Sequence, residues 1–266
     1  MDKNREIIDR IKCFVLDMDG TIYLGNDMFS FTYDFLKWVK ETGREYFFFT
    51  NNSSKSQQAY IEKLAKLDIQ IEPRQMMISS HVMIQYLKEH HPKKTIYVVG
   101  TPSLIKEFEA FDMPLVQENP DIVILGFDTT LTYEKLSKAC HYIRNGCIYY
   151  GINPDWNCPM EGGTFIPDCG SMAKLIEAST GRWPEFFGKP SRHTLDYMVK
   201  ESGCRPDEIA IVGDRLYTDI AVADGSDVTS ILVLSGETTL EDVEQSDIKP
   251  DMIRKDLSEI MDTKMH

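Results

Sequence analysis

The chain has 266 residues, 42% of them hydrophobic and 11% aromatic, so it can bury the core of one large domain or two modest ones. Its formal net charge of −13 disfavours a nucleic acid polymer or an anionic membrane as the partner, and a small anionic substrate would need a local positive site. The N-terminal "MDKNREIIDRIKCF" lacks the apolar core of a secretory signal, and no apolar run approaches the length of a membrane span. We therefore expect a cytoplasmic protein.

Strand-like and helix-like segments alternate from the N-terminus. The pattern predicts a strand over 14–17, an amphipathic helix over 29–41, a strand over 46–50 and a helix over 54–67. The hydroxyl of Ser54 is the expected cap of the last of these helices. Strand followed by helix, repeated, predicts a parallel sheet covered on both faces, as in a Rossmann-like α/β fold.

The middle of the chain predicts a second sheet. Its expected strands lie at 95–100, 121–126 and 147–151, with helices at 102–110 and 132–144 between them. The segment "INPDWNCPMEGGTFIPDCG" then shows no periodic pattern, and irregular segments of this length usually carry function or are disordered.

The alternation resumes after this segment. Helices are expected at 171–179 and 191–201, and strand-like runs at 186–190, 209–214 and 230–235. The acidic stretch 237–247 is interpreted as a solvated loop and short helix without a chemical role.

Polar residues gather where the predicted strands end, and ligands of open parallel sheets bind beyond the carboxyl ends of the strands. The residues at these positions are Asp17 and Asp19, Thr50 and Asn51, Lys189, and Asp214 with Asp219. Acidic side chains from two strand ends can bind Mg²⁺, and Asp17 and Asp214 are the expected direct ligands.

Lys189 and the Thr50 hydroxyl supply a cation and a hydrogen-bond donor suited to phosphate oxygens. Together these groups predict a centre for phosphoryl transfer, in which one carboxylate acts as nucleophile and a second carries the proton. The sequence has no Gly-x-x-x-x-Gly-Lys-[Ser/Thr] loop and no Gly-x-Ser-x-Gly, so neither a nucleotide P-loop nor a serine nucleophile is expected.

Four short motifs resemble those of the haloacid dehalogenase (HAD) superfamily of phosphatases, in the same order. They are "DMDGT" at 17–21, "TNNS" at 50–53, "GKP" at 188–190 and "GDRLYTD" at 213–219. The sequence also resembles the class IIA, NagD-like subfamily, with "ILGFD", "TYEKL" and "NPD" as further matches. This resemblance implies a Rossmann-like core of residues 1–79 and 186–266, with an inserted α/β cap for substrate specificity at 80–185.

The resemblance also implies roles for single residues. Asp17 would be the nucleophile and a Mg²⁺ ligand, while Asp19 would be the general acid and base and a ligand through its main-chain carbonyl. Asp214 would bind the metal directly, and Asp219 would support the water molecules bound to it. Thr50 and Asn51 would hold the phosphate, and Lys189 would shield the charges of the phosphate and Asp17.

One position departs from the subfamily pattern, in which the cap loop commonly reads Pro-Gly-x-Gly. The present chain has Pro167-Asp168-Cys169-Gly170 instead, which leaves the chemistry intact and the substrate open. Within the same loop, Asn153, Asp155 and Trp156 are the residues expected to contact the substrate.

The leading hypothesis is a Mg²⁺-dependent phosphatase that hydrolyses a small phosphate monoester, such as a nucleotide or sugar phosphate, through an aspartyl-phosphate on Asp17. Two alternatives remain open: a phosphotransferase or mutase that uses the same centre, and a non-catalytic regulator that binds a phosphorylated metabolite. The expected partner is a small phosphorylated metabolite, for a monomer or homodimer that binds neither nucleic acid nor membrane.

Overall fold

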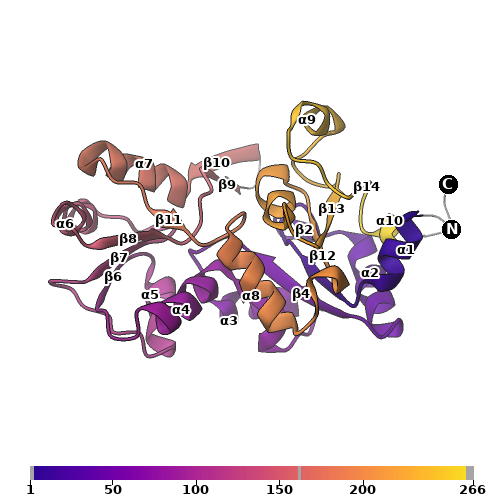
Figure 1. Cartoon of the computed structure of the whole chain (residues 1–266), viewed down its shortest axis with the longest axis horizontal. Helices are drawn as coiled ribbons and strands as arrows, with labels where there is room; N and C mark the ends of the chain where they lie inside the picture. The colour runs from indigo at the N-terminus through magenta and orange to yellow at the C-terminus, as the bar shows by residue number, and fades with distance from the viewer. Residues whose placement is uncertain (1–2, 161–162, 262–266) are drawn as a thin grey trace. The chain divides into compact units, whose positions relative to one another are not determined.

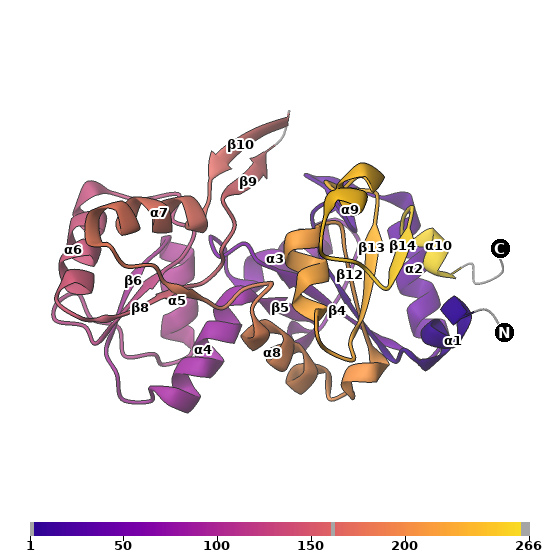
Figure 2. The same cartoon turned by 45° about the horizontal axis from the view of Figure 1, so that its top comes forward.

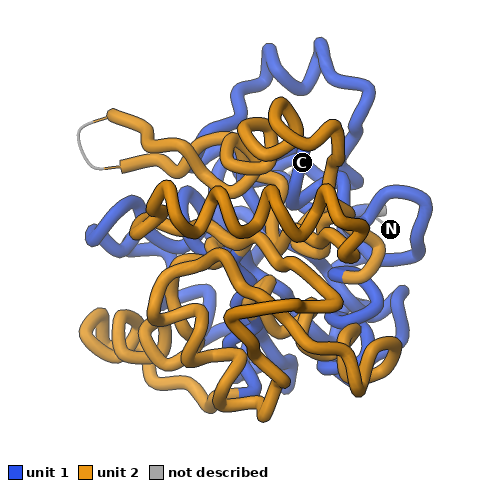
Figure 3. Tube along the Cα trace, turned by 90° about the vertical axis from the view of Figure 1, so that its left-hand side faces the viewer, with its two compact units in different colours: residues 1–50, 74–77, 194–266 blue, residues 51–73, 78–193 orange. Residues whose placement is uncertain are grey.

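The structure is a computed structural model that describes residues 3–160 and 163–261. The chain divides into two compact units, coloured in Figure 3. The first contains residues 1–50, 74–77 and 194–266, and the second contains residues 51–73 and 78–193. In the described part of the chain, no helix is both long enough and apolar enough to cross a membrane.

A six-stranded sheet forms the centre of the first unit, in the order β14-β13-β12-β1-β4-β5. The strands are β1 (Cys13–Leu16), β4 (Glu45–Thr50), β5 (Met76–Ile78), β12 (Ile209–Gly213), β13 (Thr229–Val233) and β14 (Met252–Arg254). Every residue of β1, β12 and β13 is buried, as expected for parallel strands that are covered on both faces. The expected Rossmann-like parallel sheet is therefore confirmed.

Helices and short turns surround this sheet. They are α1 (Lys3–Arg10), α2 (Ser30–Glu41), α8 (Arg192–Ser202), α9 (Leu240–Gln245) and α10 (Ser258–Met261), with short 3₁₀ turns at Pro73–Gln75, Pro206–Glu208 and Ala221–Ala223. A small hairpin of β2 (Tyr23–Leu24) and β3 (Asp27–Met28) follows β1. The ring of Phe35 packs edge-on against Phe14 at 5.3 Å between centroids, which fixes α2 to β1.

The second unit has its own parallel sheet, in the order β11-β8-β7-β6. Its strands are β6 (Ile96–Val99), β7 (Ile122–Leu125), β8 (Ile148–Gly151) and β11 (Glu185–Phe186), and its helices are α3 (Gln57–Lys66), α4 (Ser79–His90), α5 (Pro102–Ala110), α6 (Tyr133–Arg144) and α7 (Cys169–Thr180). Helices α6 and α7 cover one face of this sheet and α5 lies on the other (Figure 1). The core under α6 and α7 is a cluster of buried residues that includes Val99, Val123, Tyr149 and Ile176.

Several helix starts follow from capping. Thr101 and Thr132 accept backbone N–H groups at the starts of α5 and α6, with distances of 3.1 and 3.2 Å, so both predicted helices are confirmed. The predicted cap of α3 is wrong. Ser56 caps this helix, whereas the Ser54 hydroxyl donates to Asn52 Oδ1 at 2.7 Å.

The segment after β8 was expected to be irregular, and this expectation is wrong. It contains the antiparallel hairpin of β9 (Asn157–Met160) and β10 (Thr164–Pro167), drawn above α7 in Figure 2. A two-stranded pair with mostly exposed residues has no alternating apolar pattern, so the usual sequence signal of a strand is missing.

A second correction concerns the strand-like run 186–190. Only its first residue lies in a strand, because β11 ends at Phe186. This strand pairs with β8 in the four-stranded sheet, so Lys189 does not follow a strand of the six-stranded sheet. The core and cap assignment made from the sequence remains a prediction, with ranges that differ from those of the two compact units.

Candidate active site

Asp17 and Asp214 follow neighbouring strands. Strands β1 and β12 are parallel, with Leu16 opposite Val212, and the Asp17 N–H donates to the Val212 carbonyl at 2.8 Å. The strand order also reverses at β1, since β4 and β5 lie on one side and β12 to β14 on the other. Such a reversal is where open α/β sheets bind their ligands.

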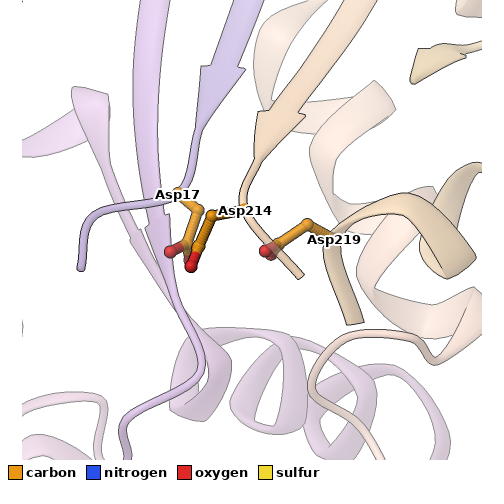
Figure 4. Close-up of side chains that lie close together, drawn as sticks. All are labelled: Asp17, Asp214 and Asp219. Atoms are coloured by element: carbon orange, nitrogen blue, oxygen red, sulfur yellow. The ribbon is translucent and has the colours of Figure 1, made fainter. Parts of the chain in front are cut away.

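Three carboxylates converge at this point. Asp17, Asp214 and Asp219 each offer one oxygen, and these oxygens lie within 4.8 Å of one another (Figure 4). Asp219 comes from the π-helical turn Leu216–Ile220, where its Oδ2 accepts the Arg215 N–H at 3.1 Å. The sequence predicted a supporting role for Asp219, and the structure places it beside the two expected direct ligands.

Asp214 is buried at the centre of several close contacts. Its side chain is buried, Oδ2 accepts the Glu237 N–H at 2.7 Å, and Oδ1 has no hydrogen-bond partner among the described residues. Burial, followed by the negative charge of Asp219, raises the pKa of Asp214 to about 7. A Cβ atom at Gly20 or Gly236 would collide with this carboxylate, so both positions require glycine.

These observations match the requirements of a hard divalent cation. Such an ion takes carboxylate oxygens as ligands and would neutralise the repulsion that the cluster otherwise carries. Oδ1 of Asp214 is a buried acceptor that no residue in 3–160 or 163–261 satisfies. The residues therefore fit a metal held by Asp17 and Asp214, with Asp219 beside them.

The loop that follows β13 takes part in the site at Glu237, which is exposed, as expected for the solvated stretch 237–247, and which also contacts the cluster. The backbone of Glu237 donates to Asp214, and its carboxylate forms an ion pair with Arg215 at 2.9 Å. The short helix expected within this stretch is confirmed as α9. The place of Glu237 just beyond the end of β13, next to β12, is the signal that could have identified it.

Asp19 lies in different surroundings. Strand β1 ends at Leu16, so Asp17 and Asp19 do not share one face of a continuing strand. The Asp19 side chain is exposed, and its Oδ1 accepts the Gly25 N–H at 3.4 Å. Its carboxylate is not part of the cluster found among the described residues, and its role as a ligand through the main-chain carbonyl remains a prediction.

The residues expected to hold the phosphate lie at the end of β4 and in the loop after β11. Thr50 is the last residue of β4 and is nearly buried, and Lys189 is 2% exposed. The Asn51 side chain forms two hydrogen bonds with the main chain of Lys189. Its Oδ1 accepts the Lys189 N–H at 2.8 Å, and its Nδ2 donates to the Lys189 carbonyl at 2.9 Å. The structure thus brings Asn51 and Lys189 together through the side chain of Asn51, whose phosphate contact remains a prediction.

The three residues predicted to contact the substrate fall into two groups. Asn153 and Asp155 are buried, and the Asn153 Nδ2 donates to Asp155 Oδ2 at 2.8 Å. Trp156 is 52% exposed, with its ring 6.1 Å from that of Trp183. Exposure leaves Trp156 accessible to a ligand, whereas the other two make polar contacts inside the protein.

Asp168, the residue that departs from the subfamily pattern, has a structural role. It precedes α7, and its Oδ1 accepts the Cys169 N–H at 2.5 Å and the Asn153 Nδ2 at 2.9 Å. Its φ of −101° is ordinary for any residue, so glycine is not required here. An aspartate at this position caps the helix and joins the polar network of the loop.

The fold and the site together define a doubly wound α/β protein with a carboxylate cluster at the ligand-binding end of its sheet. Residues 14–114 match the model of the haloacid dehalogenase-like hydrolases, and residues 186–260 match a HAD-hydrolase-like model. The acid sugar phosphatase of Staphylococcus aureus is 32% identical over 93% of this chain and 96% of its own length.

Solved structures agree with these matches. The 4-nitrophenylphosphatase of Thermotoga maritima is 41% identical, with a TM-score of 0.93 over 97% of this chain and 99% of that one. NagD from Escherichia coli K-12 is 28% identical, with a TM-score of 0.86 over 94% and 98% of the two chains. The chain belongs to the haloacid dehalogenase-like hydrolases, and it is a NagD-like phosphatase of that superfamily.

Proposed function

We propose that this protein is a Mg²⁺-dependent phosphatase that hydrolyses a small phosphate monoester through an aspartyl-phosphate on Asp17. The observation that carries the proposal is the convergence of Asp17, Asp214 and Asp219 where the strand order of the sheet reverses, with one buried carboxylate oxygen that no described residue satisfies. Relatives named acid sugar phosphatase and 4-nitrophenylphosphatase support sugar phosphates and small aryl phosphates as the first substrates to test.

Asp17 is the nucleophile in this proposal. Its carboxylate oxygen forms a bond to phosphorus while the bond from phosphorus to the ester oxygen breaks. The exposed Asp19 gives its proton to the leaving alkoxide and then takes a proton from the water that attacks the aspartyl-phosphate. Water thereby releases inorganic phosphate and returns both aspartates to their initial states.

Other residues supply charge and hydrogen bonds. Lys189 provides positive charge for the phosphate, and Thr50 with the main chain of Asn51 provides donors to its oxygens. Asp17 and Asp214 would hold the Mg²⁺, and Asp219 would support it from beside them. When bound, the ion supplies positive charge that offsets the negative charge of the phosphoryl group and the carboxylates.

The proposal also assigns roles to the two parts of the chain and a cellular compartment to the protein. Residues 1–79 and 186–266 form the catalytic core, and residues 80–185 form a cap that selects the substrate. We also propose that the protein acts in the cytoplasm.

Assays with p-nitrophenyl phosphate and a panel of sugar phosphates test the proposal. Chelation should stop phosphate release and added Mg²⁺ should restore it, while Asp17→Asn should lower kcat by at least about a thousandfold with the fold intact. Asp9→Asn, an exposed substitution in α1, is a matched control that should keep wild-type turnover. A kcat of Asp17→Asn within tenfold of wild type would exclude the covalent mechanism.

A further inference from the structure

A buried polar network joins the loop after β4 to the loop after β11. We propose that Asp155 is a positioning residue of the phosphatase reaction, which orients Asn51 and through it fixes the main chain of Lys189. This inference rests on the proposed function, because it assigns Asp155 to the placement of a charge that the reaction uses.

The first part of the network is the pair of hydrogen bonds between Asn51 and Lys189. They join the Asn51 amide to both the N–H and the carbonyl of Lys189, at 2.8 and 2.9 Å, so the main chain is held at two points. Gly188 leaves the space for this contact, since a Cβ atom there would lie 2.7 Å from Asn51 Oδ1. A shift of the Lys189 main chain would break both bonds in a buried setting, which is costly.

Asp155 reinforces the orientation of the Asn51 amide that the two contacts with Lys189 require. The Asn51 Nδ2 has two N–H groups; one donates to the Lys189 carbonyl and the other to Asp155 Oδ2 at 2.9 Å. An ionised carboxylate only accepts hydrogen bonds, so the amide nitrogen of Asn51 must point toward Asp155. The amide oxygen is then left facing the Lys189 N–H, as the contact requires.

Asp155 also accepts a hydrogen bond from a second asparagine, Asn153. The Asn153 Nδ2 donates to Asp155 Oδ2 at 2.8 Å and to Asp168 Oδ1 at 2.9 Å, while its Oδ1 accepts the Ser53 hydroxyl at 2.6 Å. Both N–H groups of the Asn153 amide are therefore used within the protein, and its oxygen already accepts one hydrogen bond. This network leaves the Asn153 amide no N–H group to donate to a substrate, and it holds Asp155 Oδ2 in position.

Positioning and substrate contact predict different kinetics. All substrates share the phosphoryl group, so loss of a residue that places Lys189 should lower kcat by a common factor for every substrate. A residue that contacts the leaving group should instead change kcat/KM unequally among substrates. A misplacement of about 1 Å near the chemistry can cost about a hundredfold in rate, which sets the expected size of the common factor.

The experiment measures kcat and KM for p-nitrophenyl phosphate and several sugar phosphates. Asp155→Ala should lower kcat by about ten- to a hundredfold on every substrate with little change in KM. Asp155→Asn, whose amide oxygen can still accept from both Asn51 and Asn153, should recover activity to within about fivefold of wild type. Unequal losses among the substrates, or no loss in Asp155→Ala, would overturn the positioning role.

Asp128→Ala is the matched control. Asp128 is also a buried carboxylate of the second unit, where it accepts from Thr130 and Lys135 at 2.6 and 2.7 Å. Its loss should reduce stability without lowering kcat, because it makes no contact with Asn51, Asn153 or Lys189 that would move them. A kcat loss in Asp128→Ala equal to that in Asp155→Ala would mean that general destabilisation explains both.

Hydrogen-exchange mass spectrometry of peptides that contain Lys189 tests the network without reference to activity. Exchange should be faster in Asp155→Ala than in wild type and unchanged in Asp128→Ala.

An inactive wild type would refute the proposed function, whereas unchanged exchange in Asp155→Ala would refute the network. If Asp155→Ala does not fold, Gly188→Ala displaces Asn51 directly and should produce the same common loss of kcat and faster exchange; wild-type kcat in that variant would overturn the inference.

Discussion

Asp17 and Asp19 are separated by a single residue in the sequence, yet their side chains have different surroundings. Asp17 lies in the carboxylate cluster, and Asp19 is exposed on the turn that leads to β2. A nucleophile benefits from a fixed position, whereas a group that gives and takes protons benefits from access to water. The difference between the two sites supports the division of roles proposed for them.

The acid and base role of Asp19 can be tested by the choice of leaving group. Asp19→Asn should lower kcat by about a hundredfold or more with an alkyl phosphate, because an alkoxide needs a proton to leave. With p-nitrophenyl phosphate the first step should be affected less, since nitrophenolate is a good leaving group. Asp27→Asn, on the exposed residue of β3, is the control and should match wild type. Equal losses in kcat/KM, which reports the first step and not the shared hydrolysis of the aspartyl-phosphate, would contradict proton donation by Asp19.

At the scale of elements, the β9–β10 hairpin differs from the rest of the second unit. Its residues are mostly exposed, and Trp156 immediately precedes it with half of its surface accessible. Asp168 follows the hairpin and begins α7, so the hairpin is fixed at its base by a helix cap. An anchored base with exposed apolar side chains suits a surface that selects among substrates.

Trp156→Ala tests this role of the hairpin base. We expect kcat/KM to change unequally among sugar phosphates, by about tenfold between the least and most affected, because only some leaving groups are large enough to contact the ring. Trp183→Phe, which retains an aromatic partner near the same ring, is the comparison variant. A uniform loss over the panel would assign Trp156 to structure rather than to selectivity.

For the whole molecule, the carboxylate cluster links stability to pH and to metal. The folded-state pKa of Asp214, about 7, is above its reference value of 3.8, so the folded protein binds this proton more tightly than the unfolded chain does. The contribution to stability is therefore complete below about pH 4 and is lost as pH rises through about 7. A bound cation would offset that loss, because it replaces the proton as the partner of the carboxylate.

Thermal unfolding with and without Mg²⁺ measures this linkage. Added Mg²⁺ should raise Tm by several degrees at about pH 8 and by much less at about pH 5, where the proton competes for Asp214. The metal-dependent rise should disappear in Asp214→Asn, and Asp224→Asn, an exposed aspartate outside the cluster, should keep it. A Mg²⁺-dependent rise in Tm that is the same at both pH values would show that metal binding does not depend on the ionisation of Asp214.

The sequence alone determined the parallel α/β class, most of the strands and helices, and the residues of the carboxylate cluster. These features depend on short-range signals: apolar runs, helix periodicity, capping residues such as Thr101, and polar residues at strand ends. Asp17 and Asp214 could be paired from the sequence because the carboxyl ends of parallel strands meet at one edge of a sheet.

Only the tertiary structure decided the surroundings of Asn51, Asp155 and Glu237. Asn51 bonds to residues 104 and 138 positions away, and no local pattern specifies which distant loop supplies a hydrogen-bond partner. The sheet to which β11 belongs and the pairing of β9 with β10 were decided in the same way. Hydrogen bonds and strand pairing depend on which segments the folded chain brings together, whereas residue type and periodicity describe only the segment itself.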